Sequence, residues 1–79
     1  MTTKEQITAW FNAGKAKGNS HMLVVCDTFY HEDYPIYCKT KADAQGELDN
    51  PGRMQRVMEI YSYNVNLQQQ LERQRVWNL

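Results

Sequence analysis

The segment HMLVVCDTFYHEDYPIYC, residues 21–38, constrains the fold more than any other part of this chain. It starts with an unbroken apolar run from Met22 to Cys26, passes through a polar and acidic stretch, and returns to an apolar run rich in tyrosine. Two such runs around a short polar stretch are typical of two antiparallel strands joined by a turn. We therefore expect a β-hairpin, with a first strand over 21–29 and a second strand that begins at Pro35, where a missing amide is tolerated.

The first strand shows no alternation of apolar and polar residues, which indicates that both of its faces are covered. A chain of 79 residues is near the lower size limit for a domain that folds without disulfides or metal ions. We predict a single domain over 1–79 whose first and last helices cover one face of a small sheet. Because so short a chain leaves little to cover the second face, we predict that another copy covers it, which makes the protein a homodimer.

A helix is predicted over residues 3–17, because Ile7, Trp10 and Phe11 form one apolar stripe at helical spacing. Gly18 can end this helix in a left-handed conformation. Two pairs of residues at the start fit a capping box, in which two side chains cap each other's backbone amides: Thr2 with Glu5, and Thr3 with Gln6.

A second, short helix is predicted after Thr40, which is a suitable N-cap, with Leu48 as its main apolar anchor. Residues 49–52 read Asp-Asn-Pro-Gly and predict a stop, with Pro and Gly at the two central positions of a type II turn.

The tail after this turn contains two apolar stripes that lie on different helical faces, so one continuous helix would have to bury both. A break near residues 62–64 removes this conflict. We therefore predict a third strand over 54–61 and a helix over 63–77, with the triplet Gln68–Gln70 on its solvent face; the alternative is a helix throughout. The expected fold is α+β, in the order helix, strand, strand, short helix, strand, helix, with a three-stranded antiparallel sheet.

Composition argues against several classes of function. Nine basic residues balance nine acidic ones, whereas a nucleic-acid-binding domain of this size normally has a basic excess. The longest apolar run, from Met22 to Cys26, is far shorter than a membrane span. The start of the chain has no apolar segment typical of a secretory signal. We therefore expect a cytoplasmic protein, no nucleic-acid or membrane partner, and two reduced cysteines that pack as small apolar residues.

Residue types suited to zinc or to nucleophilic catalysis are present, but their spacing is wrong for either. Structural zinc sites use closely spaced ligand pairs, whereas the candidate cysteines and histidines are widely separated in this sequence. A cysteine–histidine nucleophile would also need a third orienting group and an oxyanion loop. The residues concerned are His21, Cys26, His31 and Cys38.

Two further kinds of chemistry are also disfavoured. Asp27, Glu32 and Asp33 can be read as an acid–base set, but carboxylates at a turn more often cap the neighbouring backbone. The sequence contains neither of the common glycine-rich motifs that cradle phosphates. We therefore predict no catalytic residues, no metal and no cofactor, and a protein that is not an enzyme.

Surface recognition remains, and the hairpin tip is its best candidate. Aromatic and charged side chains alternate there, and tyrosine is enriched in binding surfaces because it offers a large contact area at a low entropy cost. The alternative is that Phe29 and Tyr34 fold inward and close the core. A second candidate is the tail from Arg73 to Leu79, whose Trp77 would otherwise complete the core. The predicted partner-binding residues are Asp27, Tyr30, His31, Glu32, Asp33 and Tyr34.

The segments AWFNAGKAKGNSHMLVVCDTFYHEDYPIYC, MQRVMEIYSYN and QQQLERQRVWNL resemble a group of small uncharacterised proteins encoded by phages and prophages. The resemblance covers nearly the whole chain and is densest from His21 to Tyr37. It implies a virus-derived accessory protein of the host cytoplasm, of a kind that often occupies a host target, including components of bacterial immunity. That group has no established catalytic residues to transfer to this chain.

The leading hypothesis is therefore a non-enzymatic phage-type protein that binds a host protein and inhibits a bacterial defence complex. The alternative is a protein that sequesters a nucleotide signal in a pocket between subunits. Such a pocket needs groups that donate hydrogen bonds to the phosphates, and the cations expected to converge on it are Lys39, Lys41, Arg53 and Arg56.

Overall fold

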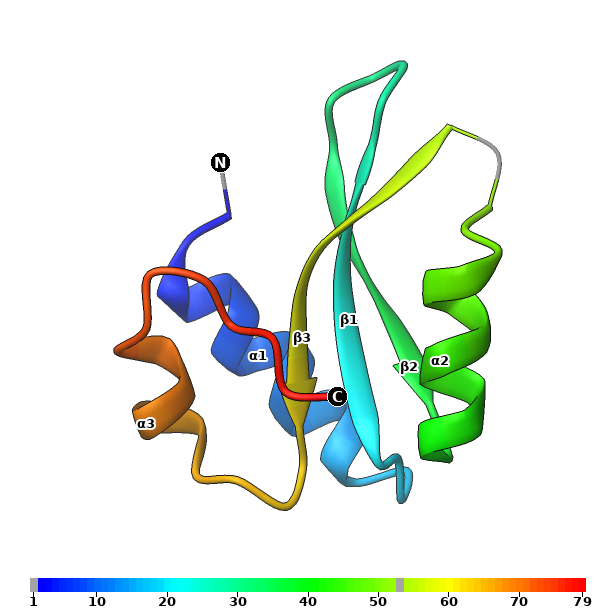
Figure 1. Cartoon of the computed structure of the whole chain (residues 1–79). Helices are drawn as coiled ribbons and strands as arrows, with labels where there is room; N and C mark the ends of the chain where they lie inside the picture. The colour runs from blue at the N-terminus through cyan, green and yellow to red at the C-terminus, as the bar shows by residue number, and fades with distance from the viewer. Residues whose placement is uncertain (1, 53) are drawn as a thin grey trace.

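The computed structural model describes residues 2–52 and 54–79. Its three strands form one antiparallel sheet in the order β2-β1-β3, so that β1 is central (Figure 1). The predicted α+β class and order of elements are confirmed. The elements are α1 (Lys4–Lys15), β1 (His21–Asp27), β2 (Asp33–Cys38), α2 (Lys41–Asp49), β3 (Gln55–Ser62) and α3 (Leu67–Leu71).

Helix α1 begins with the second of the two predicted capping boxes. The Thr3 hydroxyl accepts from the Gln6 amide, and the Gln6 side chain accepts from the Thr3 amide, both at 3.1 Å. Ile7 and Phe11 are buried against the sheet, and Gly18 has a φ of 74° beyond the end of the helix. A local signal therefore starts the helix, and a glycine lets the chain turn toward β1.

Both faces of β1 are covered by this one chain. Met22 and Val24 face a core cluster shared with α1, whereas Leu23 and Val25 face a second cluster that includes Ala44 of α2. Helix α2 lies on the opposite side of the sheet from α1 (Figure 1). We predicted that the second face of β1 needs a second copy of the chain to cover it. That reasoning is wrong, because α2 of the same chain covers this face. The homodimer itself stays a prediction without that argument.

The strand predicted over 54–61 is confirmed as β3, but the helix predicted over 63–77 is wrong. Helix α3 covers only Leu67–Leu71, and the chain then returns along β3. There Ile60 pairs in parallel with Trp77, through hydrogen bonds from the Ile60 amide to the Val76 carbonyl (2.9 Å) and from the Asn78 amide to the Ile60 carbonyl (3.0 Å).

The extended form of the tail follows from where its apolar residues are needed. Val76 is buried in the cluster under α1, and Leu79 packs on the cluster under α2, so the tail crosses the edge of the sheet. In a helix, residues three apart lie on the same side, which would place both of these residues on one face. An extended chain can reach both clusters and also covers part of the β3 edge.

Gln70 anchors this tail and corrects the prediction that the glutamine triplet faces solvent. Its side chain is 1% exposed. Its amide nitrogen donates to the carbonyls of Ser62 (2.9 Å) and Val65 (3.0 Å), and its oxygen accepts from the Ser62 amide (2.8 Å) and the Asn78 side chain (2.9 Å). One side chain therefore joins α3, the end of β3 and the C-terminal segment.

Two strand boundaries and one turn also differ from prediction. The first strand ends at Asp27 rather than at residue 29, because the tip turn already begins there. Strand β2 begins at Asp33, and Pro35 lies within it, which an edge strand tolerates. The stop at 49–52 is present without a type II turn, since Gly52 lacks the positive φ that this turn requires.

Candidate functional site: the hairpin tip and the adjacent groove

The backbone of the hairpin tip is held by Asp27. Its carboxylate accepts hydrogen bonds from the amides of Phe29 (2.8 Å) and Tyr30 (3.0 Å). Its main chain closes the turn, with its amide donating to the Glu32 carbonyl (2.8 Å) and its carbonyl accepting from the His31 amide (2.7 Å). His31 has a φ of 58°, the left-handed conformation that this tight turn requires. The tip is therefore ordered by hydrogen bonds to the carboxylate and main chain of Asp27 rather than by packing of its rings.

The aromatic rings of the tip point into solvent. Phe29 is 64% exposed and Tyr30 is 69% exposed, and the two rings meet edge to face with centroids 4.8 Å apart. Met54 is also exposed, and its carbonyl accepts from the amide of Thr28, the residue before Phe29 (2.8 Å). We define Phe29, Tyr30, His31, Glu32 and Met54 as the tip surface.

The six predicted binding residues have different positions in the structure. Tyr30, His31 and Glu32 are exposed on the tip surface. Asp27 is used by the turn, and Asp33 accepts a hydrogen bond from the Thr2 hydroxyl. Tyr34 packs on the cluster under α2, and its hydroxyl accepts from Gln55.

The sequence reasoning missed two residues of the tip surface. The alternative in which two aromatics fold inward is correct for Tyr34 and wrong for Phe29, which is exposed. Met54 was expected to begin the third strand. Its place beside Thr28 depends on the register of β3 against β1, where Asp27 pairs with Gln55. No local pattern specifies that register, so Met54 had no signal in the sequence.

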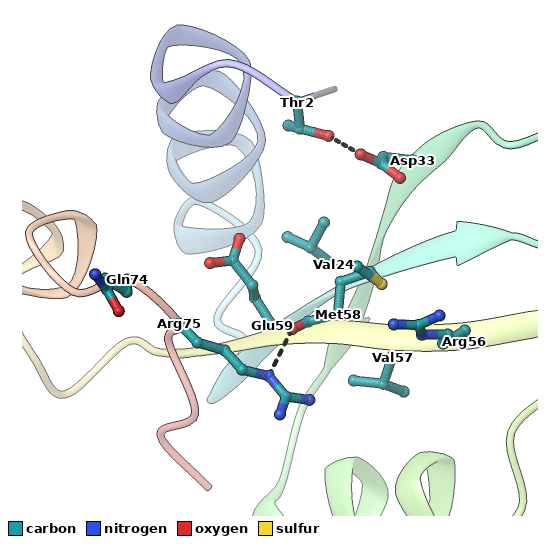
Figure 2. Close-up of a pocket in the computed structure, with 9 residues that line it drawn as sticks. All are labelled: Thr2, Val24, Asp33, Arg56, Val57, Met58, Glu59, Gln74 and Arg75. Atoms are coloured by element: carbon teal, nitrogen blue, oxygen red, sulfur yellow. Dashed lines mark hydrogen bonds between the residues drawn. The ribbon is translucent and has the colours of Figure 1, made fainter.

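A groove of about 690 Å³ lies beside β3, and its lining includes Asp33, the residue that follows Glu32 of the tip surface (Figure 2). Val24 and Met58 form its apolar floor, and Thr2 and Asp33 line one side. The C-terminal segment lines the other side with Gln74 and Arg75. A bulge in β3 opposite Val24 and Val25 contributes to its shape, because the register of β3 against β1 shifts there.

The buried His21 and Cys38 are cross-strand neighbours, but their pKa values are shifted in the directions that disfavour a nucleophile pair. Burial lowers the pKa of His21, and the charge of Lys41 lowers it further. Burial also raises the pKa of Cys38, with Glu47 and Asp43 adding to the effect. A thiolate–imidazolium pair needs the opposite shifts. His21 instead shares a 2.8 Å hydrogen bond with the Ser20 hydroxyl.

The two cysteines lie far apart along the sheet. Cys26 and Cys38 are both free thiols, and they lie opposite Asp33 and His21 near the two ends of β1. Within residues 2–52 and 54–79, no group of three or more His, Cys, Asp or Glu side chains is arranged to hold a metal ion.

The cations expected to converge on a nucleotide do not do so within one chain. Lys39 and Lys41 follow the end of β2 that pairs with His21, whereas Arg56 pairs with Cys26. These positions are five residues apart along β1, roughly 17 Å at about 3.4 Å per residue. Arg53 lies outside the described residues. The three described cations therefore do not converge within one chain, and the nucleotide pocket between subunits stays a prediction.

Comparison with known proteins gives no assignment: no family model, no curated protein and no solved structure matches this chain. Of the helices in the part of the chain that the structure describes, none combines the length and apolar character needed to cross a membrane.

Proposed function

We propose that this chain is a non-enzymatic protein-binding domain that engages its partner through the tip surface. The observation that carries the proposal is the exposure of Phe29 and Tyr30 on a turn whose backbone is already satisfied by Asp27. The rings contribute little to closing the hairpin, so their contact area is available to a partner. The resemblance to phage-encoded proteins supports a host protein as that partner, and a bacterial defence complex as the target that binding inhibits.

The energetics of the tip suit an interface hot spot. Large aromatic side chains dominate binding energy when they enter a well-packed pocket, and truncating such a residue costs about 2 kcal/mol or more. Because the turn is held by hydrogen bonds before binding, little backbone entropy remains to be lost on association. Phe29, Tyr30 and Met54 are each more than half exposed, so all three offer apolar area to a partner.

Acidic residues on and beside the tip surface indicate which charges should border the partner's pocket. Glu32 is exposed, and Asp27 and Asp33 lie next to it at the base of the turn. A partner whose apolar pocket is bordered by lysine or arginine would match this arrangement and would gain association rate from it. The salt dependence of the association rate is therefore expected to be steep.

Site-specific crosslinking tests the proposal. A photoreactive benzoylphenylalanine at Tyr30 in the bacterial host should yield one discrete crosslinked protein. The control is the same group at Val65, an apolar residue that is 37% exposed and lies in the loop after β3. That position should not crosslink the same protein.

The purified target then gives an affinity measurement. Replacing Phe29 and Tyr30 with Ser should weaken its binding by about 30-fold or more, as a loss of about 2 kcal/mol implies, whereas Val65→Ser should leave the affinity unchanged. Equal crosslinking from the two positions, or unchanged affinity of the double variant, would move the site away from the tip.

A further inference from the structure

The rim of the groove carries an arginine whose side chain is held in place. The Nε of Arg75 donates to the Met58 carbonyl (3.4 Å), and its guanidinium carbon lies 4.4 Å from the centre of the Trp77 ring. Arg75 is exposed, and Trp77 is 42% exposed, so neither residue is there to fill the core. A guanidinium held by a hydrogen bond and by stacking on an aromatic ring loses less conformational entropy when it binds a ligand.

The acidic residues of the groove have hydrogen-bond donors of their own. Asp33 accepts from the Thr2 hydroxyl, and Glu59 accepts from the Tyr61 hydroxyl at 3.1 Å. Figure 2 shows the Glu59 carboxylate pointing toward α1 and the Arg75 guanidinium pointing away from it. The contact to Met58 uses one of the five N–H donors of Arg75, and the terminal N–H groups form the fork that matches a carboxylate.

The surroundings of Arg75 add an apolar and elongated shape. Val24 and Met58 form the floor of the groove, and Val57 lines it from the other face of β3. Four consecutive residues of β3, from Arg56 to Glu59, line this groove, so it follows the strand. A ligand that fits has an extended backbone, apolar side chains for this floor and an acidic side chain for Arg75.

We infer that this groove binds an extended segment of a protein, in which a glutamate or aspartate side chain meets Arg75 and neighbouring apolar side chains contact the half-buried Met58 and Val57. The inference deepens the proposed function, because it takes the same partner to be a protein and adds a second contact region beside the tip. It names the chemistry of that region, which is a carboxylate flanked by apolar residues.

A pair of matched peptides tests the inference without knowledge of the partner. The probes are acetyl-Leu-Glu-Leu-amide and acetyl-Leu-Gln-Leu-amide, titrated into ¹⁵N-labelled protein at constant ionic strength. The Glu peptide should shift the Arg75 Nε–H and Trp77 indole resonances saturably, and the Gln peptide should bind about tenfold more weakly, as the loss of one charge-assisted contact implies. Arg75→Lys keeps the charge but not the fork, and it should reduce binding of the Glu peptide to the level of the Gln peptide.

Several outcomes would overturn the inference. These are equal binding of the two peptides, unchanged binding to a folded Arg75→Lys variant, or no saturable shift of either resonance. The Phe29→Ser, Tyr30→Ser variant separates this inference from the proposed function, because it should bind the Glu peptide as the native protein does. Loss of peptide binding in that variant would contradict a separate groove site, whereas failure of the tip crosslinks alone would leave the groove site standing.

Discussion

The two ends of the sheet use aromatic residues in opposite ways. At the end of the sheet where β1 begins, the Tyr37 hydroxyl donates to the Trp10 carbonyl of α1 (2.7 Å), and the Tyr63 hydroxyl donates to the Phe11 carbonyl (2.9 Å). Burial, followed by the influence of Tyr37, raises the pKa of Tyr63 to about 12. At the hairpin tip, Phe29 and Tyr30 point into solvent.

This difference separates residues that hold the fold from residues that are available for binding. Near α1, ring packing and hydroxyl hydrogen bonds join elements that are distant in the sequence, such as Phe11 and Tyr63, whose rings stack with centroids 4.1 Å apart. At the tip, the turn is held by Asp27, and its rings contact mainly each other. Substitutions of the aromatic residues that contact α1 should therefore lower the free energy of unfolding, and substitutions of the tip rings should not.

The largest loss of stability is expected from Gln70→Leu. The change leaves the Ser62 amide and the carbonyls of Ser62 and Val65 without their side-chain partner, and each such buried group costs about 1 kcal/mol or more. We expect the free energy of unfolding to fall by about 3 kcal/mol in urea denaturation. The control is Gln69→Leu on the exposed side of α3, which should change it by less than about 0.5 kcal/mol. Similar values for the two variants would remove Gln70 as the anchor of the tail.

Gly14→Ala should have the next largest effect, although alanine favours helices. A Cβ at Gly14 would overlap the Tyr63 hydroxyl and the Tyr37 ring, so the aromatic packing near α1 would have to shift. Overpacking of this kind costs about 1–3 kcal/mol. At Gly46 of α2 a Cβ meets nothing within 4 Å, so Gly46→Ala should instead raise stability by up to about 1 kcal/mol. Thermal melts that move in the same direction for both variants would contradict this packing.

His21 gives a smaller and pH-dependent effect. Burial, and then the charge of Lys41, lowers the pKa of His21 in the folded protein below its ordinary value near 6.5. His21 therefore binds a proton more readily in the unfolded chain than in the folded protein. The contribution of neutral His21 to stability is complete above pH 6.5 and is lost as the pH falls through the lowered pKa. Urea denaturation between pH 7 and pH 5 should show a steeper loss for the native protein than for His21→Asn. Parallel pH profiles would exclude His21 as the cause.

Elements with local signals could be predicted from the sequence. Thr3 with Gln6 caps α1, and Thr40 accepts from the Asp43 amide at the start of α2. The apolar run of β1 also predicted a strand covered on both faces. The cover on the second face was missed because α2 is only weakly amphipathic, with Ala44 and Leu48 as its main contacts to the core.

The tail and parts of the site depend on long-range contacts, and these could not be predicted. Gln70 is a polar residue that is buried only because backbone groups of Ser62 and Val65 need a partner. Met54 reaches the tip through the pairing of β3 with β1, and Arg75 reaches the groove through the parallel pairing of the tail with Ile60. Residue type did predict the hairpin tip as a candidate, but it did not predict which of its rings is exposed.

If the rings of the tip are not needed for folding, the Phe29→Ser, Tyr30→Ser variant should keep the free energy of unfolding of the native protein. We expect a change within about 0.5 kcal/mol for each substitution, as is usual for exposed positions. The Val65→Ser variant, at another exposed apolar position, should give a change of the same size. A loss of several kcal/mol in the double variant alone would show that Phe29 and Tyr30 hold the hairpin, and it would contradict the assignment of the tip to partner binding.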